Sequence, residues 1–190
     1  MAHKQADHVC PPWLGYFLLA NPLRRLLYTA RSILGPYLSE GMTVLEPGPG
    51  MGFFTLEAAR LVGPKGRVVA VDIQLKMLEV LRRRAERAGL LERLDARLIR
   101  DNDLGIEDLR GKVDFVLAFA MVHEVPDAGK FFSETSAALK PGGRMLFAEP
   151  SGHVSEEHFA SLIVQAQEAG LRPESLPVIR LSRSVLLVKQ

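Results

Sequence analysis

The sequence predicts an α/β fold: a doubly wound sheet of five parallel strands with a C-terminal antiparallel hairpin and helices on both faces. Three observations support this prediction. From residue 41 onward, short apolar runs alternate with segments of helical periodicity. Clusters of glycine and proline separate the two kinds of segment. Two further apolar runs end the chain with about one residue between them, which indicates an antiparallel pair.

Each element follows from its own local pattern. The first helix is predicted over 21–34, because Asn21 can cap it and Pro22 suits the first helical position. Valine-rich and otherwise apolar runs predict strands over 43–48, 67–73, 95–100, 113–120 and 144–150, and a hairpin over 176–182 and 184–189. Apolar residues at helical spacing predict helices over 53–62, 75–88, 127–139 and 155–169.

Length and composition narrow the class of protein. A chain of 190 residues suits one structural domain, with an N-terminal segment and helix over 1–40 and the sheet over 41–190. A net charge of +2 gives no reason to expect a nucleic-acid partner. No apolar run approaches the roughly 20 residues that span a membrane. Cys10 is the single cysteine, so a reducing, cytoplasmic location is the default expectation.

A glycine cluster between the first strand and the following helix is the strongest functional signal. It reads VLEPGPGMGFFT, with glycines at 48, 50 and 52. Glycine is needed where backbone turns tightly or lies against a ligand, and ligands of open α/β sheets bind at the carboxyl ends of the strands. The spacing differs from the dinucleotide fingerprint G-x-G-x-x-G, because Phe53 fills the position of its third glycine. Gly48, Gly50 and Gly52 are therefore expected to cradle a different ligand.

Two acids stand at the ends of strands beside this loop. Glu46 would repel a pyrophosphate, and it suits a ligand with a positive amine, such as the methionine part of S-adenosylmethionine. Asp72 ends the second strand and can accept hydrogen bonds from both hydroxyls of a ribose. The alternatives are a solvated loop acid for Glu46 and a helix cap for Asp72. Their positions directly after hydrophobic strands favour the ligand roles.

Four segments together resemble the successive motifs of class I S-adenosylmethionine-dependent methyltransferases, which have a Rossmann-like fold. They are VLEPGPGMGFFT (44–55), VVAVDI (68–73), FVLAFAMVHEV (115–125) and LKPGGRMLFAEP (139–150). The nearest group is the small-molecule enzymes similar to the ubiquinone/menaquinone-biosynthesis methyltransferases. The chain departs from that family at Glu46, where Asp is usual, and near Pro49, where Cys, Ser or Thr is frequent. The resemblance implies S-adenosylmethionine as cofactor and a small-molecule methyl acceptor.

The resemblance also implies roles for particular residues. The loop after the third strand should face the adenine, with either Asp101 or Asn102 bonded to its amino group; the choice between them stays open. Ile73 is expected to cover the adenine ring. Phe119, at the end of the fourth strand, should lie beside the methionine part of the cofactor, although core packing explains this residue equally well.

Methyl transfer from a sulfonium is an in-line displacement, in which the protein chiefly aligns the reactants and excludes water. A base helps only if the nucleophile carries a proton. His123, just past the fourth strand, is the candidate base, because histidine accepts protons near neutral pH. The equal alternative is that it packs and hydrogen-bonds at the rim. His153 follows the fifth strand at the same rim. It is either a residue of the site or an ordinary polar residue of a loop.

By the same resemblance, residues 1–40 comprise an N-terminal segment that is expected to fold over the site as a lid, and the first helix. Trp13, Tyr16 and Phe17 are its aromatic residues, and the simpler interpretation of Trp13 and Phe17 is that they pack the segment down.

Imidazole and thiolate groups also raise the question of a metal. His8 and Cys10 could meet His123 and His153 as ligands of zinc or copper. The chain has no C-x-x-C or H-x-x-x-H pair, so no metal is predicted.

Two other function classes remain to be weighed. A nicotinamide-dependent oxidoreductase would share the sheet, but Phe53 and Glu46 oppose a dinucleotide. A non-catalytic module that binds S-adenosylmethionine is the other. No substrate domain interrupts the sheet, so the acceptor pocket falls to the N-terminal segment or to a second subunit in a homodimer.

Overall fold

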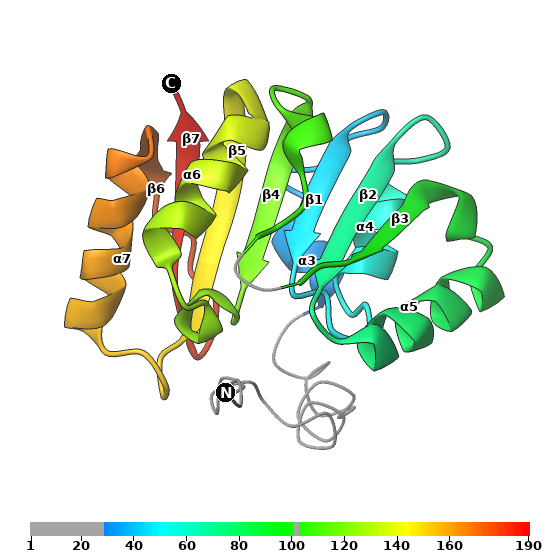
Figure 1. The fold of residues 1–190 in the computed structure, drawn as a ribbon, viewed down its shortest axis with the longest axis horizontal. Helices are drawn as coiled ribbons and strands as arrows, with labels where there is room; N and C mark the ends of the chain where they lie inside the picture. The colour runs from blue at the N-terminus through cyan, green and yellow to red at the C-terminus, as the bar shows by residue number, and fades with distance from the viewer. Residues whose placement is uncertain (1–28, 101–102) are drawn as a thin grey trace, which may run out of the picture.

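One seven-stranded sheet forms the framework of the protein. The structure is a computed structural model that describes residues 29–100 and 103–190. Within these residues the strand order is β3-β2-β1-β4-β5-β7-β6 (Figure 1). The strands are β1 (Thr43–Pro47), β2 (Arg67–Asp72), β3 (Leu94–Leu98), β4 (Val113–Phe119), β5 (Leu139–Pro150), β6 (Leu171–Ser175) and β7 (Ser182–Lys189).

The pairing of the strands confirms the predicted fold class. β1 is parallel to β2 and β4, β2 to β3, and β4 to β5. β7 is antiparallel to both β5 and β6. From β1 the chain first builds outward through β2 and β3, and it then returns to place β4 on the other side. This reversal between β1 and β4 is the switch point at which open α/β sheets bind ligands.

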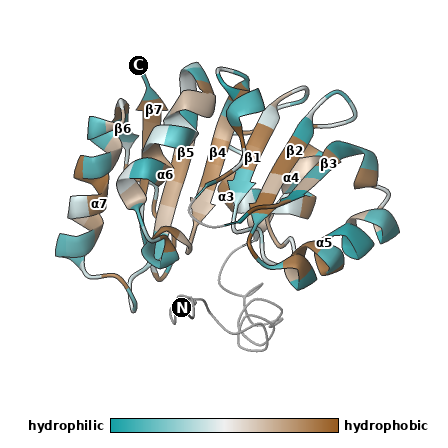
Figure 2. Cartoon of the chain, in the orientation of Figure 1, coloured by the Kyte–Doolittle hydropathy of each residue, from teal (hydrophilic) through white to brown (hydrophobic). Residues whose placement is uncertain are grey.

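Helices cover both faces of the sheet. They are α3 (Ala30–Leu34), α4 (Thr55–Leu61), α5 (Leu75–Arg87), α6 (Ala128–Ala138) and α7 (Glu156–Glu168), with short 3-10 turns η1 (Leu91–Arg93), η2 (Glu107–Leu109) and η3 (Val122–Glu124). Two core clusters result. Leu34, Ala58 and Leu81 join α3, α4 and α5 to one cluster. Phe132 and Leu162 join α6 and α7 to the other. Figure 2 shows hydrophobic strands between helices whose outer faces are largely hydrophilic.

The position of the C-terminal hairpin differs from the prediction. Its first strand is β6, not the predicted run 176–182, and residues 176–181 form the connection to β7. A reversal of chain direction needs more room than the one residue that the prediction left. Pro177 lacks the N–H that a ladder requires, and Val178 is 100% exposed. Apolar composition alone therefore misplaced this strand.

Smaller differences concern the ends of elements. β5 begins at Leu139 rather than at 144, with a register shift where it leaves α6. Within the predicted helix 21–34, the described part is α3, which Thr29 caps through a hydrogen bond from the N–H of Ser32; residues 21–28 lie outside the described ranges. Among the described helices, none combines the length and apolar character that crossing a membrane requires.

Candidate functional site

The three glycines of the loop between β1 and α4 all adopt left-handed backbone conformations. Their φ angles are 66° at Gly48, 53° at Gly50 and 83° at Gly52. Residues with a Cβ adopt this region only at a cost of roughly 1–2 kcal/mol. The loop shape is therefore specific to glycine, and it folds the chain tightly over the carboxyl end of β1.

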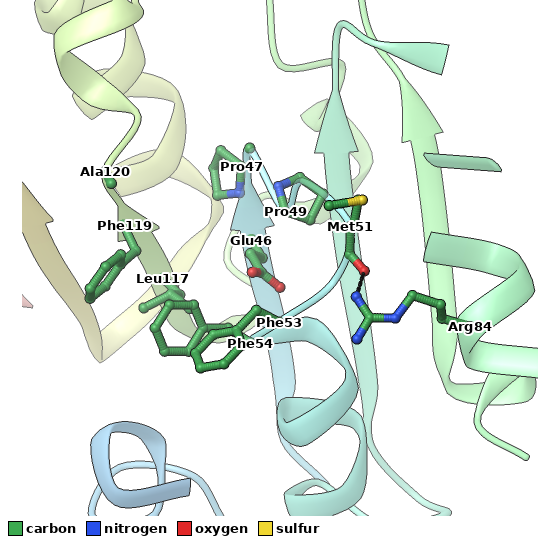
Figure 3. A pocket seen from close by; sticks show the side chains of 11 residues that line it. Glu46, Pro47, Pro49, Met51, Phe53, Phe54, Arg84, Leu117, Phe119 and Ala120 are labelled. Carbon is green, nitrogen blue, oxygen red and sulfur yellow. Dashed lines mark hydrogen bonds between the residues drawn. The ribbon is translucent and has the colours of Figure 1, made fainter. Parts of the chain in front are cut away.

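A cavity lies beneath this loop, between it and the end of β4 (Figure 3). Glu46 faces the cavity from β1, and Phe119 and Ala120 line it from the end of β4. Phe54 packs against Phe119 with their ring centroids 4.6 Å apart. The other lining residues are Pro47, Gly48, Pro49, Met51, Phe53, Arg84 and Leu117. One wall of the cavity is thus aromatic and another carries a carboxylate.

Glu46 is the most unusual group at this site. It is 4% exposed, and its Oε2 atom has no hydrogen-bond partner in the described part of the chain. Burial, with a smaller effect of the nearby charge of Asp72, raises the pKa of this carboxyl group to about 7 against the lowering effect of the Thr55 side chain. A buried carboxylate oxygen without a partner calls for a donor from a ligand, because an unpaired buried charge is costly.

Asp72 ends β2 at the same edge of the sheet. Its Oδ1 atom accepts a hydrogen bond of 2.8 Å from the N–H of Gln74, which holds the carboxylate at the start of α5. Burial raises the pKa of Asp72 to about 6. Ile73, the next residue, is exposed beside it. The structure thus places both acids and the predicted cover of the adenine ring along one edge.

His123 lies in the η3 turn that follows β4. Its Nδ1 atom is 2.6 Å from Oε2 of Glu149, at the end of the neighbouring strand β5. The other oxygen of Glu149 accepts hydrogen bonds from the backbone N–H groups of Val122, at 2.7 Å, and of His123, at 3.3 Å. Glu149 is 0% exposed, and the hydrogen bond that its carboxylate accepts from the ring raises the pKa of His123.

The structure also brings the second predicted rim histidine close. The ring centroids of His153 and His123 are 6.2 Å apart. The backbone N–H of His153 donates to the carbonyl of Pro150, which turns the chain out of β5. Within residues 29–100 and 103–190, no group of three or more His, Cys, Asp or Glu side chains is arranged to hold a metal.

Several predicted site residues lie outside the described ranges. They are His8, Cys10, Trp13, Tyr16 and Phe17 in the N-terminal segment, and Asp101 and Asn102 in the loop after β3. Their proposed roles in the lid, at a metal and at the adenine stay predictions.

Sequence reasoning missed several residues of the site. Phe54 and Arg84 line the cavity, and the Nη1 atom of Arg84 donates to the carbonyl of Met51 at 2.5 Å (Figure 3). Phe54 and Arg84 both lie in segments predicted as helices, where the sequence pattern indicated only a packed or a solvent-exposed side chain. Glu149 carried a signal that could have found it, since it is an acid at the end of an apolar strand, like Glu46.

Comparison with known proteins identifies the family of the chain. Residues 38–174 match the methyltransferase domain family. The chain is 33% identical to a protein-L-isoaspartate O-methyltransferase of Methanothrix thermoacetophila, over 72% of this chain and 58% of that protein. It is 33% identical to the ubiquinone/menaquinone biosynthesis C-methyltransferase UbiE of Pasteurella multocida, over 58% of this chain and 40% of that protein. The chain thus matches only part of the length of these two relatives.

A solved structure shares the fold along nearly the whole chain. The SAM-dependent methyltransferase from Aquifex aeolicus superposes with a TM-score of 0.83 over 96% of this chain and 100% of that one, at 23% identity. The family match covers well over half of the 190 residues. The chain therefore belongs to the methyltransferase domain family, the S-adenosylmethionine-dependent class to which the glycine loop and the two rim acids pointed.

Proposed function

We propose that this protein binds S-adenosylmethionine in the cavity under the glycine loop and transfers its methyl group to a small-molecule acceptor. The observation that carries the proposal is the buried, unpaired Oε2 atom of Glu46. The ammonium of the methionine part supplies the donor that this oxygen lacks, and a pyrophosphate would meet repulsion there. The residues present therefore fit this cofactor.

The other contacts follow from the order of the strands. Asp72, at the end of β2, holds the ribose hydroxyls, and the exposed Ile73 covers the adenine ring. The adenine amino group is assigned to Asp101 or Asn102. Phe119 bounds the methionine part from the end of β4. Each assignment rests on position along one sheet edge and on the resemblance to the family.

The cofactor supplies an electrophilic methyl group on a sulfonium. The protein's part is to align the acceptor with that methyl and to keep water away. Phe54 and Phe119 provide apolar surface for this purpose. His123 is proposed as the base, and the N-terminal segment 1–40, with Trp13, Tyr16 and Phe17, as the lid that completes the acceptor pocket together with His153.

Calorimetry with S-adenosylmethionine and with its demethylated product tests the cofactor site. Saturable binding is expected at micromolar to sub-millimolar strength. Asp72→Ala should abolish it by removing the ribose contact, and Gly50→Trp by filling the loop. Glu168→Ala, which removes an exposed acid from α7, is the matched control and should bind normally. An absence of heat with both ligands would contradict the proposal.

Turnover tests the activity separately. Labelled cofactor is incubated with the protein and an extract of small metabolites, and transfer of the methyl group to a new molecule is expected. Binding without any transfer would instead favour a non-catalytic module.

A further inference from the structure

The contact between His123 and Glu149 is more elaborate than packing at a rim requires. Glu149 is fully buried, yet both of its oxygens are used. Oε1 receives the N–H groups that open the η3 turn, and Oε2 receives the imidazole ring. One buried carboxylate therefore fixes both the backbone and the ring of His123, and it does so from a different strand, β5.

This contact determines which ring nitrogen carries the proton. An ionised carboxylate can only accept, so Nδ1 of His123 must donate to Glu149. In the neutral ring, Nε2 is then left with its lone pair. The side chain of His123 is 21% exposed, so part of the ring is accessible to another molecule. At a pH above the pKa of the ring, a neutral imidazole held in this form is a proton acceptor.

The surrounding charges increase the basicity of the ring. The hydrogen bond from the ring to Glu149 raises the pKa of His123 above its ordinary value, burial opposes the increase, and the charges of Glu149 and Glu124 add to it. Glu124 lies in the same turn, with Oε1 3.9 Å from Nε2. His153 faces the ring from the segment after β5. Two acids and one histidine are thus the titratable groups around His123 in the described structure.

The turn that carries His123 continues directly from the cavity. Phe119 and Ala120 line the cavity, and η3 begins two residues later. Ala120 has a φ of 56°, and its N–H donates to the carbonyl of Ala148 at 2.7 Å. The strained residue redirects the chain from β4 into η3, and Ala148 precedes Glu149 in β5. The base and its partner are therefore anchored at the edge where the methyl group would be presented.

We propose that Glu149 is a positioning residue that holds His123 as a general base, and that the acceptor is therefore a phenol- or enol-type hydroxyl. This inference rests on the proposed function. An amine attacks through the lone pair of its unprotonated form, which it reaches by losing a proton to water, and thiols ionise readily near neutral pH, so a positioned base contributes less for either than for a hydroxyl. A hydroxyl keeps its proton near neutral pH, and it becomes a good nucleophile only as that proton leaves.

The step balances without any further reactant. The hydroxyl oxygen forms a bond to the methyl carbon, while the carbon–sulfur bond breaks and its electron pair stays on sulfur. The hydroxyl proton moves to Nε2 of His123. The carboxylate of Glu149 offsets the positive charge of the imidazolium, which then returns its proton to water.

Glu149→Gln tests the positioning role without an acceptor. A glutamine keeps the shape of the glutamate side chain but has only one oxygen. That oxygen is expected to accept the hydrogen bonds from the backbone N–H groups of Val122 and His123. Its amide then donates to Nδ1, which forces the proton of the neutral ring onto Nε2. At a pH above the pKa of the ring, nitrogen-15 NMR of labelled histidine should show the proton on Nδ1 in the parent and on Nε2 in the variant. Glu124→Gln is the control that removes a neighbouring charge and should leave the tautomer unchanged.

An unchanged tautomer in Glu149→Gln, with normal binding of S-adenosylmethionine by calorimetry, would overturn the positioning role and leave the proposed function intact. A fold check by circular dichroism accompanies both variants. In turnover, Glu149→Gln should lose on the order of 100-fold in rate or more. His123→Gln should lose a similar factor, since the two residues act as one unit.

The acceptor class has its own measurement. S-adenosylmethionine labelled with carbon-13 in its methyl group is incubated with the protein and a metabolite extract, and the shift of the transferred methyl identifies the atom that it joins. A methoxy signal is expected. A methyl on sulfur, nitrogen or carbon would overturn the hydroxyl assignment. No labelled product would defeat the proposed transfer activity itself, and the acceptor class with it.

Discussion

At the scale of single residues, Glu46 combines burial with an oxygen that has no partner among the described residues. Its pKa, raised to about 7 by burial, lies inside the range of ordinary experiments. Under the proposed function the ammonium of the cofactor pairs with the ionised form, so the affinity for S-adenosylmethionine should increase about fivefold from pH 6 to pH 7, about twofold more by pH 8, and then level off. Calorimetry across this range measures the effect.

Glu46→Gln supplies the control for this pH dependence. The variant cannot ionise, so its affinity should be flat over the same range and weaker than that of the parent by about 10-fold or more at pH 7.5, the value of a charge-assisted hydrogen bond. An equal slope in parent and variant would assign the titration to another group.

Glu46 should also lower the free energy of unfolding of the protein when no cofactor is bound. Folding raises the pKa of Glu46 from 4.5 to about 7, so the native state holds a proton that the unfolded state has lost within this window. The free energy of unfolding therefore falls as pH rises from 4.5 to 7 and stays low above it. Glu46→Gln should raise the Tm by several degrees at pH 8 and have little effect at pH 4.5. An identical rise in Tm at pH 8 and at pH 4.5 would show that ionisation of Glu46 is not the cause.

At the scale of elements, the turn from β1 into α4 depends on a glycine at position 52. A Cβ there would collide with the fully buried side chain of Leu81 in α5, and the φ of 83° is unfavourable as well. Gly41 has a similar φ of 88°, and nothing lies within 4 Å of the corresponding Cβ. Gly52→Ala should therefore lower the free energy of unfolding by about 1–3 kcal/mol more than Gly41→Ala. Equal losses in urea titrations would show that Leu81 moves aside freely.

The elements that sequence could predict are those with a strong local signal. The apolar run of β4 and the caps Asp127 and Ser155 of α6 and α7 each specify their element without help from the rest of the chain. The hairpin fails this condition. Leu171 and the exposed Leu176 look alike as apolar residues, and only pairing with β7 separates strand from loop.

The site shows the same division. The placement of Glu46 and Asp72 at one edge could be predicted, because each lies at the end of a buried strand and the ends of parallel strands share one edge. The contact between His123 and Glu149 could not, because it joins residues 26 positions apart. That contact depends on the register in which β4 pairs with β5, where Phe119 lies opposite Ala148. Sequence patterns identify elements, but they do not determine such a register.

At the scale of the whole molecule, the ends of β1, β2 and β4 act together, so a bound cofactor ties separate elements into one native state. A ligand that binds only the folded chain adds about 2.7 kcal/mol of stability at 100 times its Kd. For a domain of this size the gain corresponds to a rise in Tm of about 5–10 °C with S-adenosylmethionine. NADH at equal concentration should cause no rise, since the carboxylate of Glu46 repels its pyrophosphate. Asp72→Ala should lose the response to S-adenosylmethionine, and a rise with NADH of similar size would mean that the loop accepts a dinucleotide after all.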